Sequence, residues 1–123
     1  MDKIALKSTL LGGLLAKLDQ ESLGSVNNIL SDDNVKKFFS DEELITTVEV
    51  FFENNLNIIK ASEKLIIHRN TLIYRIEKIK KMMGLDIRNF EDAVTLQTLL
   101  ILKQFEVKRK RQANKVVRLQ PLE

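Results

Sequence analysis

The hydrophobic pattern is clearest between residues 57 and 83, where it predicts two helices joined by a tight turn. In the second helix, placed over about 69–83, apolar residues recur every three or four positions and fall on one stripe. The stripe consists of Leu72, Ile76, Ile79 and Met83. The opposite side carries Asn70, Tyr74, Glu77, Lys78 and Lys81. One face of this helix therefore belongs in a core, and the other is free for a partner.

The first helix of the pair is shorter and is predicted to begin after Asn57, which is a favourable N-cap residue. Its buried face is predicted to contain Ile58, Ala61 and Leu65. Only residues 66–68 remain for the connection, which is the length of a turn. Two helices joined in this way form a helix-turn-helix, whose second helix enters the major groove of DNA and contacts base edges with its N-terminal side chains.

The same segment resembles the C-terminal DNA-binding domain of the PucR and CdaR type of bacterial transcription regulators, whose helix-turn-helix is similar to that of Fis. The resemblance covers roughly residues 42–105 and rests on the run HRNTL-x-YR at 68–75, followed by Gly84-Leu85-Asp86. The other matching positions are Asn57, Ala61, Leu65, Ile76, Asp92 and Leu96. This combination is far more specific than a bare helix-turn-helix pattern. The sensory domain usual in the family has no counterpart here, so the resemblance implies that a small-molecule effector acts only through a domain absent from this chain.

Ile66 departs from the general helix-turn-helix pattern, which favours Gly at this position of the turn. A β-branched side chain resists the left-handed backbone conformation that Gly adopts readily. We therefore expect Ile66 to have a negative φ, in a turn slightly different from that of Fis.

Residues 1–40 are predicted to form N-terminal helices that link or support the domain. Leucines at 10, 11, 14, 15 and 18 have helical spacing, but Gly12-Gly13 costs about 1 kcal/mol per residue relative to Ala, so this helix is expected to bend or to begin after Gly13. We interpret it as packed on its own core, with a dimerisation helix or a linker as the alternatives. A second helix is expected over 19–30, and residues 31–37 are expected to form a loop before a short turn with Phe38-Phe39.

The domain itself is assigned to residues 41–107. Ser40 and Glu43 are predicted to form a capping box at the start of its first helix, which in the resembling family packs across the helix-turn-helix pair. Asn54-Asn55 is predicted to end that helix, and Gly84 to end the recognition helix. The buried face of the first helix is expected to contain Leu44, Ile45, Val48, Phe51 and Phe52.

The last helix is expected to start after the cap residue Asn89 and to be apolar on more than one side. Its apolar residues are Val94, Leu96, Leu99, Leu100, Ile101, Leu102 and Phe105. Such a helix is either central to the core or shared with a second subunit, and the two options are compatible. Residues 108–123 form a basic tail, read either as a solvated helix end or as a second phosphate contact.

Composition sets the class of the protein. The chain has 123 residues, 44% of them hydrophobic and 30% charged, with one Pro and four Gly, which predicts an all-α domain: a core of four or five helices with additional N-terminal helices. No apolar run is long enough to span a bilayer, and no secretory signal follows Met1-Asp2. The absence of cysteine excludes disulfides, in keeping with the bacterial cytoplasm as the expected location.

Positive charge is concentrated on the helix-turn-helix. Lys and Arg number five against ten acids before residue 57, seven against two over 57–83, and eight against five from residue 84 onward. Cations gathered on one segment are what binding to DNA phosphates requires. We expect the acidic first half of the chain to face away from DNA.

Candidate DNA contacts follow from the chemistry of the duplex, in which cations bind phosphates and oriented polar groups read bases. Arg69 and Asn70 are predicted to read guanine and adenine, and Ile73 a thymine methyl group. The complete predicted set is His68, Arg69, Asn70, Thr71, Ile73, Tyr74, Lys78, Lys81 and Lys60. Arg75 lies at the edge of the buried stripe, where an ion pair with Glu43 or Glu49 is the alternative to a DNA contact.

Other function classes lack the residues they need. The sequence has no phosphate-binding loop, no dinucleotide fingerprint, no zinc-protease motif and a single histidine, so we expect no enzyme, no metal and no cofactor. The expected partner is double-stranded DNA, bound by a homodimer because one helix-turn-helix reads few base pairs. The alternative is a helical interaction or dimerisation module that docks through its apolar helices and does not contact DNA.

Overall fold

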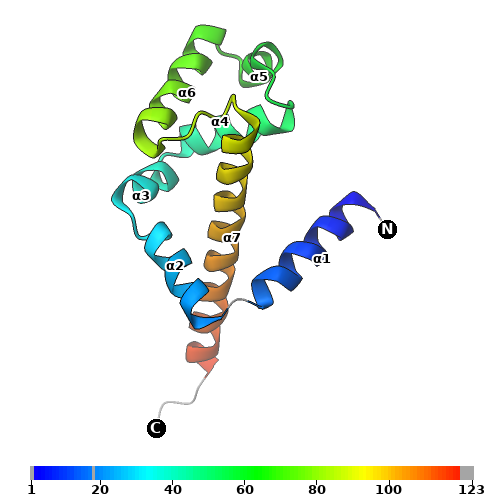
Figure 1. Cartoon of the computed structure of the whole chain (residues 1–123), viewed down its shortest axis with the longest axis vertical. Helices are drawn as coiled ribbons and strands as arrows, with labels where there is room; N and C mark the ends of the chain where they lie inside the picture. The colour runs from blue at the N-terminus through cyan, green and yellow to red at the C-terminus, as the bar shows by residue number, and fades with distance from the viewer. Residues whose placement is uncertain (1, 18, 120–123) are drawn as a thin grey trace. The chain divides into compact units, whose positions relative to one another are not determined.

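The computed structural model describes residues 2–17 and 19–119, and within these ranges it contains seven helices and no strand (Figure 1). The predicted all-α class is confirmed. The helices are α1 Lys3–Ala16, α2 Gln20–Leu30, α3 Asp33–Ser40, α4 Glu42–Glu53, α5 Ile58–Leu65, α6 Arg69–Met83 and α7 Phe90–Leu119. The chain forms two compact units, Met1–Asp32 and Asp33–Glu123. No helix of the described part is long and apolar enough to cross a membrane.

In the first unit, α1 is continuous through Gly12-Gly13, so the predicted bend or late start is wrong. Its described apolar side chains are not packed: Ile4 is 79% exposed and Leu14 is 66% exposed. The interpretation of α1 as a helix packed on its own core is therefore wrong for the predicted residues Leu10 and Leu14; Leu18 and the side chains of Leu11 and Leu15 lie outside the described part of the chain. The predicted second helix is confirmed as α2, and Leu30 at its end is buried.

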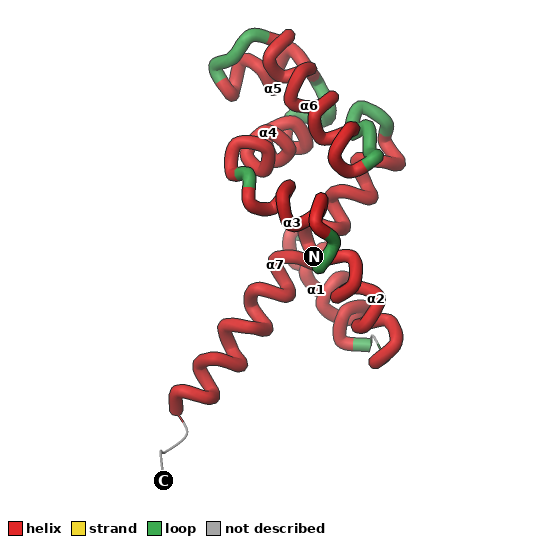
Figure 2. Tube along the Cα trace, turned by 90° about the vertical axis from the view of Figure 1, so that its left-hand side faces the viewer, coloured by secondary structure: helices red, strands yellow, loops and turns green. Residues whose placement is uncertain are grey.

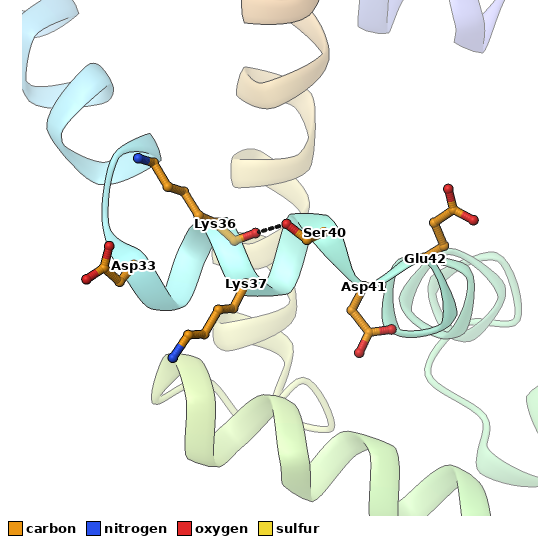
Figure 3. Close-up of a pocket in the computed structure, with 6 residues that line it drawn as sticks. All are labelled: Asp33, Lys36, Lys37, Ser40, Asp41 and Glu42. Atoms are coloured by element: carbon orange, nitrogen blue, oxygen red, sulfur yellow. Dashed lines mark hydrogen bonds between the residues drawn. The ribbon is translucent and has the colours of Figure 1, made fainter.

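The junction between α3 and α4 differs from the sequence prediction. Residues 33–40 form a helix where a loop and a short turn were expected, because Val35 and Phe38 bury one face of it. Ser40 is the last residue of this helix and donates its hydroxyl to the Lys36 carbonyl at 2.8 Å, so the predicted capping box is wrong (Figure 3). Asp41 has the extended backbone that an N-cap needs, and its Oδ1 accepts the Leu44 N–H at 3.1 Å.

Figures 1 and 2 show the arrangement of α3 through α7 in the second unit, and all five helices contribute buried side chains to one core. Helix α4 packs against α3, α5 and α6, and α6 packs against α3 and α5. The core residues of this unit are Val35, Phe38, Leu44, Val48, Phe51, Ala61, Leu72, Ile76, Ile79, Ile87, Ala93, Leu96 and Leu99. Two of the expected core residues, Ile45 and Phe52, are half-buried at its edge.

Helix α7 begins at the predicted cap: Oδ1 of Asn89 accepts the Glu91 N–H at 2.9 Å. Its inner side is buried at Ala93, Leu96 and Leu99, and the ammonium group of Lys103 lies 5.6 Å from the centre of the Phe39 ring on α3. Val94 and Phe105, which are 47% and 42% exposed, lie off the buried side. The helix continues to Leu119, so residues 108–119 of the predicted basic tail have a helical backbone.

Candidate nucleic-acid interface

Side-chain caps fix the beginning of both helices in the helix-turn-helix. Oδ1 of Asn57 accepts the Lys60 N–H at 2.9 Å, as predicted for the N-cap of α5. At α6 the cap is His68, whose Nδ1 accepts the Asn70 N–H at 3.0 Å. The histidine thus lies directly before the N-terminus of α6, where the sequence placed it, and its accepting Nδ1 leaves the proton of a neutral imidazole on Nε2.

The backbone of the turn between the helices differs from the prediction for Ile66. Ile66 has φ 56° and ψ 47°, so the expected negative φ is wrong. The left-handed residue allows two hydrogen bonds that close the end of α5, from the Ile66 N–H to the Glu63 carbonyl and from the Ile67 N–H to the Ser62 carbonyl, both at 3.1 Å. This backbone conformation costs an L-residue about 1–2 kcal/mol, so the compact turn is formed in spite of the side chain.

One side of α6, which we call the inner face, consists of Leu72, Ile76 and Ile79, all with no exposed surface. This confirms the predicted stripe, although Met83 at its end is only half-buried. Arg75 lies at the edge of the inner face. Its Nε is 3.4 Å from Oε1 of Glu43, and its Nη1 donates to the hydroxyl of Thr47 at 3.1 Å. The ion pair with Glu43, one of the two predicted alternatives, is therefore confirmed.

The opposite side, which we call the outer face, begins with a run of exposed polar residues, Arg69, Asn70 and Thr71. Tyr74 follows at 68% exposure, and Ile73 is half-buried beside it. No acid in the described part of the chain lies within ion-pair distance of Arg69, Lys60 or Lys81, and all three are exposed. The structure thus places His68, Arg69, Asn70 and Thr71 together at the N-terminal end of α6, whereas Lys60 lies on α5 and Lys78 and Lys81 lie in the C-terminal half of α6.

The C-terminal part of α6 is different, because two of its three lysines have an acidic partner. Nζ of Lys78 lies 3.8 Å from the carboxylate of Asp41, and Nζ of Lys80 lies 3.9 Å from that of Asp86. Asp41 and Glu43 come from the acidic first half of the chain, and both form ion pairs with side chains of α6. The charge count could not reveal this, since it carries no information on which helices pack together.

Arg88, which was not among the predicted site residues, links the C-terminal end of α6 to the following loop. Its guanidinium donates to Asp86 and to Glu77. These hydrogen bonds raise the pKa of Arg88 above its usual range, and the bonds from Arg88 lower the pKa of Asp86. Gly84, at φ 73°, ends the helix as predicted. The recognition helix is thereby held at its C-terminal end, while its N-terminal end is open.

The family assignment follows from comparison with known proteins. The sequence profile of the PucR C-terminal helix-turn-helix domain matches residues 44–102, from α4 into α7. This segment belongs to that family. The match includes the helix-turn-helix, most of α4 and the first part of α7, but not α3, which packs against α6 and contributes Phe38 to the core of this unit.

Curated relatives share this region. The purine catabolism regulatory protein of Bacillus subtilis is 30% identical over 91 residues, which is 74% of this chain and 17% of the relative. The carbohydrate diacid regulator of Escherichia coli is 40% identical over 58 residues, 47% of this chain and 15% of the relative. The proline-responsive transcriptional activator of B. subtilis is 35% identical over 89 residues, 67% of this chain and 22% of the relative. The chain therefore spans less than a quarter of the length of these relatives, and no solved structure matches it.

The PucR-type domain offers little for other chemistry. Among the described residues no group of three or more His, Cys, Asp or Glu side chains is placed to hold a metal ion. A shallow depression at the α3–α4 junction is lined by three acids, two lysines and Ser40, and its charges are mixed (Figure 3). The open N-terminal end of α6 is the surface with a consistent chemistry.

Proposed function

We propose that this chain is the DNA-binding part of a bacterial transcription regulator and that the N-terminal end of α6 enters the major groove. The observation that supports this most directly is the exposed run from His68 to Thr71, which caps and begins a helix whose inner face is buried and whose C-terminal end is held by Arg88. A helix-turn-helix contacts bases with this part of its second helix. The regulators that share the domain have the role expected of such a surface.

In this proposal some of the candidate residues contact bases and others contact phosphates. Arg69 and Asn70 read guanine and adenine through paired hydrogen bonds, and Ile73 contacts a thymine methyl group. Thr71 adds a hydroxyl near the bases, and Tyr74 bonds a phosphate or lies along the groove. The imidazole of His68 donates Nε2–H to a phosphate, since Nδ1 is engaged in the cap. The lysines at positions 60, 78 and 81 contact phosphates and supply affinity independent of sequence.

The remaining assignments extend this role. The domain, taken as 41–107, acts as a homodimer on two half-sites, because a single helix-turn-helix reads few base pairs. A small-molecule effector acts through a sensory domain that is not part of this chain. The protein works in the bacterial cytoplasm, where its DNA lies, and it is not an enzyme.

The test is binding of the purified chain to random-sequence duplex DNA over a series of salt concentrations. Phosphate contacts release counterions, so the logarithm of the binding constant is expected to fall by roughly 0.9 units per contact for each tenfold rise in salt. Arg69→Ala is expected to weaken binding. Docking through apolar helices, the alternative function, predicts no binding to the duplex, and its affinity for a protein partner would hardly change with salt.

The matched control is Arg88→Ala, which removes the same charge from a residue bound to Glu77 and Asp86. Circular dichroism checks that both variants are folded. Equal loss of binding in the two variants would mean that net charge matters and not the position of Arg69. The proposed function would be contradicted if the wild-type chain did not bind DNA at low salt although circular dichroism showed it to be folded and sedimentation showed it to be a dimer.

A further inference from the structure

Four residues in the described part of the chain have a positive φ, and three of them have a local reason for it. Gly84 has no Cβ, and Asn55 belongs to a residue type that tolerates the left-handed region. Leu56 follows Asn55 and is half-buried, so its side chain gains packing. Ile66 is the exception, because a β-branched residue is the type least suited to φ 56°.

The side chain of Ile66 gains nothing from the fold in return. It is 90% exposed, the highest value among the large apolar side chains of the described residues. Asn55 and Ile66 occupy the same position in the same kind of helix end, since in both cases the next residue donates its N–H back into the last turn. Ile66 is therefore unfavourable in the free protein both in its backbone and in its exposure. Strain of this kind persists mainly at functional sites.

The position of Ile66 indicates which partner would bury its exposed apolar side chain. It lies two residues before the cap His68 and three before Arg69, so its Cα is within about 11 Å of the Cα of Arg69. The segment 64–76, which contains Ile66 and the start of α6, includes no acid and carries the exposed cations Lys64 and Arg69. An exposed apolar side chain beside exposed cations suits a surface whose phosphates flank apolar sugar and base atoms.

We propose that Ile66 is part of the DNA-binding surface and packs against apolar atoms of the duplex next to the recognition helix. These atoms are the C5-methyl group of a thymine or the carbons of a deoxyribose. The inference rests on the proposed function, and it adds to the predicted contacts a residue that contributes through the turn and not through α6.

The experiment compares the wild type with Ile66→Ala and Ile66→Gly on a duplex that the wild type selects from a randomised pool. Loss of the apolar contact is expected to weaken binding by about tenfold in both variants. The thermal midpoint is expected to rise by about 2–4 °C in Ile66→Gly, because relief of the strained backbone outweighs the added freedom of glycine. Weaker binding together with a stability that is not reduced separates a lost contact from a damaged fold.

The matched control is Asn55→Gly, which changes the equivalent position at the end of α4 and is expected to bind as the wild type does. A second duplex with uracil in place of thymine identifies the contacted atoms. Weakened wild-type binding to it, with no further effect in Ile66→Ala, indicates a thymine methyl group, and an equal effect of Ile66→Ala on both duplexes indicates a sugar.

Three results would overturn the inference. Wild-type affinity in both Ile66 variants would place the side chain off the DNA while leaving the proposed function intact, and a second copy of the chain or another protein would then be the partner to examine. Weak binding in Ile66→Gly alone would assign the effect to a flexible turn. Failure of the wild type to select or bind any duplex would end both proposals.

Discussion

The inner and outer faces of α6 are set by different constraints. Leu72, Ile76 and Ile79 on the inner face are fully buried and belong to the core of the second unit. Arg69, Asn70 and Tyr74 on the outer face are exposed, and within the described part of the chain their side chains form no ion pair and no hydrogen bond with another side chain. Substitution on the inner face should therefore change stability, and substitution on the outer face should change binding without changing stability. The following variants test how sharp this division is.

The largest effect is expected for Ile76→Ala. Removal of a fully buried side chain costs its transfer free energy and leaves a cavity, so the free energy of unfolding is expected to fall by about 2–5 kcal/mol. Urea denaturation measures it. Tyr74→Ala, on the other side of the same helix, is the matched control and is expected to change stability by no more than about 0.5 kcal/mol. Similar losses in the two variants would show that the two faces are not separate.

Asn70→Ala is expected to act on base preference and leave the fold intact. The loss of a paired hydrogen bond to one base reduces discrimination at that position by about 1–3 kcal/mol. Selection from a randomised duplex pool, with wild type and variant in parallel, reveals which position becomes indifferent. Affinity for non-specific DNA should be almost unchanged, because Asn70 carries no charge. An unchanged base preference would remove Asn70 from the residues that read sequence.

Arg75 lies between the two faces and tests the boundary. Its side chain is 17% exposed, but its partner Glu43 is 67% exposed, so solvent screens the ion pair and the hydrogen bond to the buried Thr47 carries more of the effect. Arg75→Met is expected to cost about 1–2 kcal/mol of stability. A double-mutant cycle with Thr47→Val isolates the pair. Additive losses in the cycle would mean that the two residues are not coupled, and Arg75 would return to the candidates for DNA contact.

The contrast between the faces also explains what the sequence could predict. The stripe of α6, the caps Asn57 and Asn89, and the terminator Gly84 follow from local rules that need only a few neighbouring residues, and all are confirmed. The start of α4 follows a local rule too, but two adjacent residues, Ser40 and Asp41, are both suitable N-caps. The sequence favoured Ser40 because it matches the capping box. In the structure Ser40 is the last residue of α3, and Asp41 is the cap.

Other features depend on packing between helices and could not be predicted from the sequence. The role of Thr47 requires knowing that α4 lies against α6, and the same knowledge is needed to pair Asp41 with Lys78. Ile66 shows the opposite case. The preference of β-branched residues for a negative φ is a local rule, but the hydrogen bonds that end α5 require a left-handed residue at this position, so the predicted sign of φ was wrong. The residues proposed to contact DNA stay predictions, since exposure alone does not identify a partner.

The smallest effect, and the finest test of the outer face, concerns its lysines. Lys81 has no ion pair among the described residues, whereas Lys78 lies 3.8 Å from Asp41. If both contact phosphates, Lys81→Ala and Lys78→Ala should each flatten the slope of log affinity against log salt by about 0.9 units, on all sequences alike. Lys103→Ala, a change of the same charge on α7 beside Phe39, should leave the slope as it is. A wild-type slope in Lys78→Ala alone would mean that this lysine serves Asp41 and the α4–α6 contact. The outer face would then contain a structural residue, Lys78, between DNA-binding residues at the N-terminal end of α6 and Lys81 near its C-terminal end.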